Sequence, residues 1–182
     1  MLEQFIVSAV GANRPGIVAQ VAREIYHCGC NFEDSRMNFL GIHFSLMILV
    51  TGDRPGLYEA LQESCRKLSR EGDLNVSVFK RTVRADAADE VPTPDYDIRV
   101  RGEDRMGIVY RTSQLLAALN VNIVEMETVV EAGEEEQDTQ AFSMRIKAAI
   151  PRTLSEETLQ RHLEALSEEI EETVTITPIR AE

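Results

Sequence analysis

The feature that most constrains the fold is an internal repeat, because one short glycine turn occurs twice in the chain. Gly11-Ala-Asn-Arg-Pro-Gly-Ile-Val18 is followed ninety-one positions later by Gly102-Glu-Asp-Arg-Met-Gly-Ile-Val109. Each turn follows alternating apolar residues and precedes apolar residues at helical spacing, which is typical of a corner between a strand and a helix. The repeat therefore predicts two copies of one structural unit.

The pattern of the first copy predicts the order strand, helix, strand, strand, helix, strand. Thr51-Gly-Asp-Arg-Pro-Gly56 resembles a third glycine turn, but it joins the third strand to the second helix and is interpreted as a plain connector. The strands are expected over residues 4–10, 30–39, 44–50 and 74–78, and the helices over residues 17–29 and 57–72.

The second copy keeps this order with one insertion. Val121-Asn122-Ile123 matches Cys30-Asn31-Phe32 at the same offset of ninety-one, whereas Phe142-Ser-Met144 matches Phe44-Ser-Leu46 at an offset of ninety-eight. Seven residues are therefore inserted between these points. The acidic segment Ala132-Gly-Glu-Glu-Glu-Gln-Asp138 is expected to lengthen the hairpin there.

Residues 84–95 show no periodicity and contain two prolines, which predicts a linker between module 1 at residues 1–83 and module 2 at residues 96–182. Each β-α-β-β-α-β module is expected to have a ferredoxin-like α+β fold, with a four-stranded antiparallel sheet and two helices on one face.

The glycine corners suit an anionic ligand. The first amides of a helix lack intrahelical partners and lie at the positive end of the helix dipole. Gly16 and Gly107 carry no side chain where a carboxylate or phosphate would approach those amides. Glycine between a strand and a helix is equally ordinary turn chemistry, and neither turn has the glycine spacing of a dinucleotide or P-loop motif.

Composition excludes several classes of protein. Cys28, Cys30 and Cys65 are too few for a disulfide framework, and the first two are too closely spaced for a zinc knuckle, so we expect no metal and no cofactor. A net charge of −12 disfavours direct binding to nucleic acid. The absence of a secretion signal and of a long apolar segment predicts a cytoplasmic protein that does not bind membranes.

A unit with [Asn/Asp]-Arg-x-Gly-Ile-Val at its first corner and Asn at the opening of its second strand resembles the ACT domain, a regulatory module that senses amino acids. The resemblance covers residues 5–83 and 96–179. A chain of two such modules resembles the glycine cleavage system transcriptional repressor group. This resemblance implies a protein that responds to glycine and binds a transcription activator, without contacting DNA itself.

The resemblance also implies a ligand site at each corner, which in many ACT proteins lies between two modules. The corner amides would take the carboxylate of an amino acid, and the strand-opening Asn would take its ammonium group. The residues concerned are Asn13, Arg14, Pro15, Gly16, Ile17 and Asn31 in the first module, and Asp104, Arg105, Met106, Gly107, Ile108 and Asn122 in the second.

Other roles for these side chains stay open on the residues alone. Asn31 and Asn122 are also explained by a hydrogen bond at a helix end or strand start, and Arg14 and Arg105 by ion pairs or solvation at the surface. Met106 replaces the proline of the first turn, so the two corners need not be equivalent.

The leading hypothesis is a non-enzymatic amino-acid sensor that represses glycine cleavage expression through a protein partner and forms a homodimer. The alternative is a constitutive interaction or dimerisation module without a small-molecule ligand, in which the corners are only turns. An enzyme is disfavoured, because the chain has no Ser-His, Cys-His or metal-ligand pattern and no candidate catalytic residue.

Overall fold

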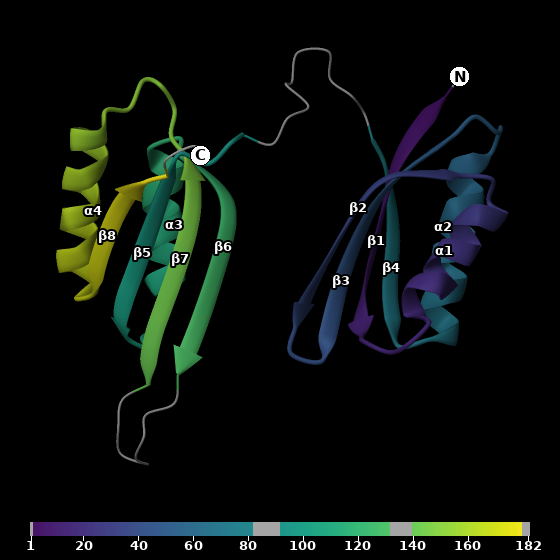
Figure 1. Cartoon of the computed structure of the whole chain (residues 1–182), viewed down its shortest axis with the longest axis horizontal. Helices are drawn as coiled ribbons and strands as arrows, with labels where there is room; N and C mark the ends of the chain where they lie inside the picture. The colour runs from purple at the N-terminus through teal and green to yellow at the C-terminus, as the bar shows by residue number, and fades with distance from the viewer. Residues whose placement is uncertain (1, 82–91, 132–139, 180–182) are drawn as a thin grey trace. The chain divides into compact units, whose positions relative to one another are not determined.

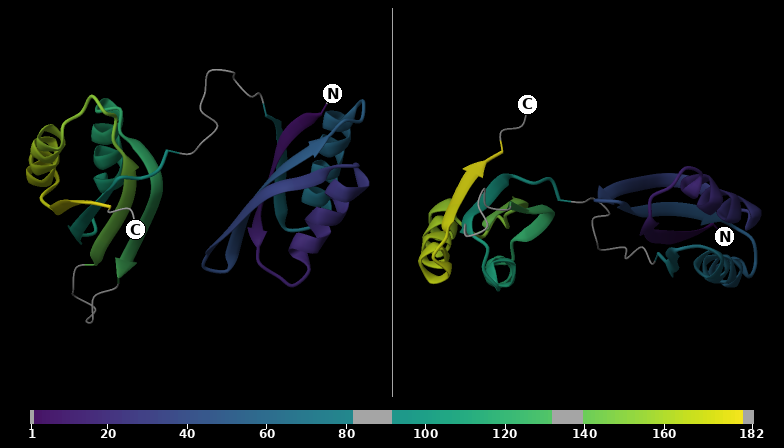
Figure 2. Two further views of the ribbon diagram at one scale, coloured as in Figure 1. Left: turned by 45° about the horizontal axis from the view of Figure 1, so that its top comes forward. Right: turned by 90° about the horizontal axis from the view of Figure 1, so that it is seen from below.

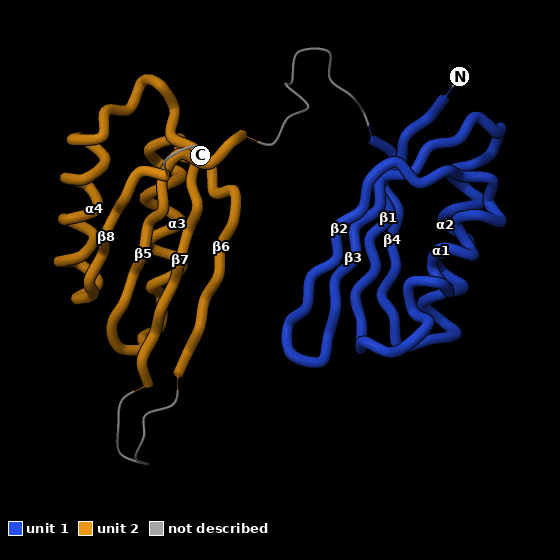
Figure 3. The backbone as a smooth tube through the Cα atoms, in the orientation of Figure 1, with its two compact units in different colours: residues 1–87 blue, residues 88–182 orange. Residues whose placement is uncertain are grey.

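The computed structural model describes residues 2–81, 92–131 and 140–179 of the chain. These residues belong to two compact units, residues 1–87 and residues 88–182 (Figure 3). Most of the predicted linker and the acidic insertion at residues 132–138 lie outside the described residues. The last linker residue, Asp95, already hydrogen-bonds to the second unit through the main chain of Ala148 and Ile179.

The first unit has the predicted order of elements. Its four strands form one antiparallel sheet in the order β2-β3-β1-β4. Helices α1 and α2 lie next to each other on one face of that sheet (Figures 1 and 2). The elements are β1 (Glu3–Ala12), α1 (Ile17–His27), β2 (Asn31–Leu40), β3 (His43–Gly52), α2 (Leu57–Glu71) and β4 (Leu74–Lys80).

The second unit repeats this topology, with strand order β6-β7-β5-β8 and helices α3 and α4 in contact on one face of the sheet (Figure 1). The predicted fold of two ferredoxin-like α+β modules is therefore confirmed. The elements are β5 (Tyr96–Glu103), α3 (Ile108–Ala118), β6 (Asn122–Glu131), β7 (Ala141–Ala149), α4 (Glu156–Ile170) and β8 (Thr173–Pro178).

Each unit has its own hydrophobic core between the sheet and its two helices. In β1, for example, Phe5, Val7 and Ala9 are buried, whereas the residues between them face the other side of the sheet. The helices complete the core with apolar stripes three or four residues apart. No helix among the described residues is long and apolar enough to span a bilayer.

The two sheet faces that the helices leave uncovered differ in chemistry. In the first unit, Val10, Met47 and Phe79 on this face are each at least half exposed. In the second unit, the corresponding face carries Asp97 and Arg99 of β5, which alternate with core residues of the same strand. The first unit therefore exposes large apolar side chains on this face, next to the hydrogen-bonded Ser8 and Ser77, whereas the second exposes charged ones.

Asp97 is the centre of the charged face. It is only 5% exposed, and it accepts hydrogen bonds from Nε of Arg145 at 2.8 Å and Nε of Arg99 at 3.1 Å. Burial by itself raises the pKa of Asp97, but the hydrogen bonds from Arg145 and Arg99 outweigh it and hold the pKa below the ordinary value of 3.8. The ionised carboxylate thus ties β5 to β7 across the sheet.

Asp97→Asn is expected to lower the free energy of unfolding by about 1–2 kcal/mol at neutral pH, because two half-exposed arginines lose a charged acceptor. Since folding lowers the pKa of Asp97, its contribution is complete above pH 3.8 and disappears as the pH falls through the folded-state pKa. Urea denaturation should therefore show the gap between wild type and variant closing in acid.

Glu125→Gln is the matched control, because Glu125 pairs with Lys147 in the same sheet at 2.7 Å but is 57% exposed. Its effect is expected to stay within roughly 0.5 kcal/mol. A gap between wild type and Asp97→Asn that stays constant down to low pH would contradict the role given to the ionised carboxylate.

Candidate ligand corners and the adjoining pocket

The first predicted corner joins the end of β1 to the start of α1. The amide of Asn13 donates to the carbonyl of Ile42 at 2.8 Å, which fixes the turn to the β2–β3 hairpin. Gly16 then adopts a left-handed backbone with φ of 85°, and no side chain caps the helix. The first turn of α1 therefore begins with its amide end uncapped, as a carboxylate site requires.

The side chains of this corner divide between surface and core. Asn13, Arg14 and Pro15 are exposed, whereas Ile17 is buried in the core. Arg14 donates a hydrogen bond of 2.6 Å to Oε1 of Gln20. Ile17 can therefore offer a ligand only its main chain, and its amide already contacts the carbonyl of Arg14 at 3.2 Å.

The second corner has the same backbone. Gly107 has φ of 98°, helix α3 again has no side-chain cap, and the amide of Asp104 donates to the carbonyl of Gln140 at 2.7 Å. Met106 is fully exposed where the first corner has proline, and Ile108 is buried as Ile17 is. The duplicated sequence thus folds into duplicated geometry.

The arginines distinguish the two corners. Arg105 donates to Glu171 at 2.5 Å and to Glu103 at 3.1 Å, and its Nε lies 4.0 Å from Oε1 of Glu172. The hydrogen bonds to Glu171, first, and to Glu103 raise the pKa of Arg105. Arg14 bonds instead to a neutral amide, so the charge environment of the corners is not equivalent.

The left-handed glycine is not confined to the predicted ligand corners. Gly56, in the segment interpreted as a connector, has φ of 74° and also precedes a helix without a side-chain cap. Helix α4 differs, because Oγ of Ser155 accepts a hydrogen bond from the amide of Thr158. Backbone geometry alone therefore does not single out a ligand corner.

Asn31 and Asn122 open β2 and β6 at exposed positions, as predicted, but lie far from the corners of their own units. Asn31 pairs with Thr51, which also pairs with Gln4 near the start of β1. The corner follows Ala12 at the other end of that strand, which at about 3.3 Å per residue is roughly 26 Å away. Within one unit, the structure does not bring the Asn and the corner together.

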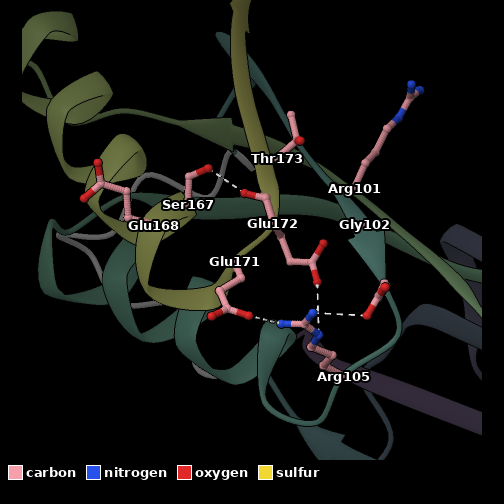
Figure 4. Close-up of a pocket in the computed structure, with 9 residues that line it drawn as sticks. Arg101, Gly102, Arg105, Ser167, Glu168, Glu171, Glu172 and Thr173 are labelled. Carbon is pink, nitrogen blue, oxygen red and sulfur yellow. Dashed lines mark hydrogen bonds and ion pairs between the residues drawn. The ribbon is translucent and has the colours of Figure 1, made fainter. Parts of the chain in front are cut away.

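A pocket of about 490 Å³ adjoins the second corner and was not predicted from the sequence (Figure 4). It lies between the end of β5 and the turn from α4 into β8. Its lining residues are Arg101, Gly102, Glu103, Arg105, Ser167, Glu168, Glu171, Glu172 and Thr173.

Glu172 is the unusual residue of this pocket. Its side chain is 2% exposed, and its Oε1 accepts no hydrogen bond from the described part of the chain. A Cβ at Gly102 would overlap Oε2 of Glu172, so only glycine leaves room for the carboxylate. The sequence contains one indication that Glu172 is unusual. At the offset of ninety-eight residues, it aligns with the apolar Leu74 of the first unit.

The three cysteines lie in the core of the first unit and are unpaired. Burial, followed by the neighbouring Cys28, raises the pKa of Cys30 and of Cys65 to about 11. Sγ of Cys28 lies 3.3 Å from Oγ of Ser64. These thiols pack as small apolar side chains in that core.

Comparison with known proteins identifies related chains. An ACT domain family model matches residues 3–79. The chain is 32% identical over 167 residues to the glycine cleavage system transcriptional repressor of Escherichia coli strain K12, covering 91% of this chain and 84% of that protein.

Two crystal structures have the same fold over the whole chain. A protein of unknown function from Galdieria sulphuraria matches with a TM-score of 0.72 at 26% identity, covering 99% of this chain and all of its own. A protein provisionally described as a glycine cleavage system transcriptional repressor matches with a TM-score of 0.71 at 21% identity, covering 100% and 99%.

Replacement of Gly16, Gly56 or Gly107 by Ala is expected to lower the free energy of unfolding by about 1–2 kcal/mol, because each glycine is left-handed. A Cβ at Gly16 or Gly56 would meet nothing within 4 Å, so the loss there is conformational. Chemical denaturation measures this loss in the free energy of unfolding. Gly16→Asn should recover part of the loss, since Asn tolerates this conformation, and equal stability of all variants and wild type would contradict the assignment.

Proposed function

This chain of two ACT-type units belongs to the family of the glycine cleavage system transcriptional repressor, and we propose that it is a non-enzymatic cytoplasmic sensor that binds a small amino acid. In this proposal, the ligand-bound and ligand-free forms differ in their affinity for a protein partner. Glycine is the first candidate ligand, because the Escherichia coli relative is named for the glycine cleavage system.

The observation that carries this proposal is the separation of each corner from the Asn of its own unit. The amides that follow Gly16 are separated from Asn31 by roughly the length of β1. In this proposal, a site that uses both groups takes the corner from one copy of the chain and the Asn from a second copy. An amino acid bound there would hold two copies of the chain together, which is a change that a partner can detect.

Residue roles follow from this geometry. The main-chain amides at the starts of α1 and α3, after Gly16 and Gly107, would hold the carboxylate. Exposed side chains around each corner would shape the site, and the strand-opening asparagines would come from a second copy of the chain. The proposed ligand residues are Asn13, Arg14, Pro15, Gly16, Ile17 and Asn31, with Asp104, Arg105, Met106, Gly107, Ile108 and Asn122.

A protein partner fits the charge of the chain better than DNA does. The net charge of −12 opposes the phosphate backbone, whose binding depends on clustered Lys and Arg. A transcription activator with a basic surface would instead be attracted. We therefore propose that repression acts through such a protein, without direct contact with DNA.

The alternative function, a constitutive interaction module, is favoured by the uncovered sheet face of the first unit. Val10, Met47 and Phe79 lie exposed on it, and β2 is an edge strand. Such a surface can form a homodimer or hold a partner without any ligand. Saturable binding of an amino acid separates the two functions.

The amino-acid proposal is tested by a thermal-shift screen of the twenty amino acids. A ligand at one hundred times its dissociation constant stabilises the native state by about 2.7 kcal/mol, which is several degrees for a chain of this size. We expect glycine or another small amino acid to give this shift, and Gly16→Ala or Gly107→Ala to reduce it.

Gly56→Ala is the matched control for this experiment, because it introduces the same strain at a left-handed glycine outside the proposed corners. It should retain the full ligand shift. If no amino acid stabilises the wild-type protein, the sensor proposal fails and the interaction module becomes the better account.

The absence of direct DNA contact is tested by gel-shift titration with the operator region of a glycine cleavage operon. At physiological salt we expect no complex at micromolar protein, because the acidic chain lacks the electrostatic term that supplies non-specific binding. A complex that forms with the purified protein alone, and weakens with added salt, would contradict partner-mediated repression.

A further inference from the structure

We propose that the second unit binds the ammonium group of an amino acid on Glu172, in the pocket beside its corner. This inference rests on the proposed amino-acid sensing, and it assigns the ammonium subsite to a residue outside the corner motif. It also makes the second unit chemically different from the first.

The first support is the unsatisfied oxygen. Glu172 has a side chain only 2% exposed, and no described group donates a hydrogen bond to its Oε1. Nε of Arg105 is 4.0 Å away, too far for a hydrogen bond, and Arg105 already donates to Glu103 and Glu171. A buried carboxylate accepts hydrogen bonds and cannot donate them, so this oxygen needs a donor from outside the chain.

The second support is the comparison within the molecule. In the first unit, Gly11 pairs with Leu74, and the Leu74 side chain lies where a Cβ of Gly11 would be. In the second unit, a Cβ of Gly102 would likewise meet the side chain of Glu172. The fold therefore accepts an apolar side chain at this place, and packing alone does not require the carboxylate of Glu172.

The surroundings hold the main chain of Glu172 in position. Oγ of Ser167 donates to the main-chain carbonyl of Glu172 at 2.5 Å, which fixes the turn between α4 and β8. Figure 4 shows the Glu172 carboxylate directed toward Gly102 and Arg105, between the end of β5 and this turn. The turn that carries Glu172 is thus held by the fold itself.

The charges of the pocket favour a cationic group. Four glutamates and two arginines line it, and the described residues contain no group of three side chains that could hold a metal ion. A primary ammonium offers three donors and matches a single carboxylate oxygen. Arg101 lines the same pocket and has no partner among the described residues, so it would assist the amides after Gly107 in binding the ligand's carboxylate.

The test uses the full-length protein with three probes: glycine, ethanolamine, which lacks the carboxylate, and glycolate, which lacks the ammonium group. We expect glycine to raise the melting temperature, ethanolamine to raise it less, and glycolate to leave it unchanged. A glycolate shift equal to that of glycine would overturn the ammonium subsite.

Two variants locate the subsite. Glu172→Leu copies the first unit, and it is expected to raise the melting temperature of the unliganded protein while weakening glycine binding by about tenfold or more. Glu172→Gln keeps the shape of the side chain and should also weaken glycine binding. Glu164→Gln is the control, because it removes an equal charge from an exposed residue of α4 that does not line the pocket, and it should leave binding unchanged.

The outcomes separate the two proposals. Undiminished glycine binding in both Glu172 variants would place the ammonium group elsewhere and overturn this inference, while the sensor function would stand. Stabilisation of the wild-type protein by none of the three probes, nor by any other amino acid, would overturn both. If a bound water donates the missing hydrogen bond to Glu172 instead, no amine should change the melting temperature.

Discussion

The left-handed backbone at Gly16 and Gly107 is the constraint on which each unit depends. It lets the first strand turn directly into a helix that packs back on the same sheet, with Ile17 or Ile108 as its first core residue. A side-chain cap at these positions would occupy the same amides that a ligand needs. The turn therefore serves the fold and leaves the helix end available, whereas Ser155 closes that end in α4.

Most of the fold could be predicted, because burial of one face gives each strand or helix a periodic pattern of apolar residues. Alternation in β1 and the three-to-four spacing in α1 follow from a core on one side only. The offsets between the two repeats then located the same strands and helices in the second unit. The positions of Asn31 and Asn122 at the strand starts could be predicted in the same way. Their distance from the corners depends on how the strands pair and run, which local sequence patterns do not predict.

The pocket at Glu172 could not be predicted from local pattern. Glutamate before a strand is ordinarily solvated, and its burial here arises from contact with Gly102, seventy residues earlier in the chain. Asp97 is a similar case, because its partner Arg145 comes from a different strand. In both cases a charged side chain is buried through contacts with residues distant in the sequence. Only the tertiary structure therefore shows the desolvation cost and the groups that could offset it.

The two buried carboxylates of the second unit differ in that compensation. Asp97 is satisfied by two guanidinium groups, so its charge stabilises the folded sheet without any ligand. Glu172 has one oxygen without a donor, so the unliganded unit retains a desolvation cost that an apolar residue would avoid. A ligand that supplies the missing donor removes this cost only in the folded state. The unit is therefore more stable with the ligand than without it, and a thermal shift measures this difference.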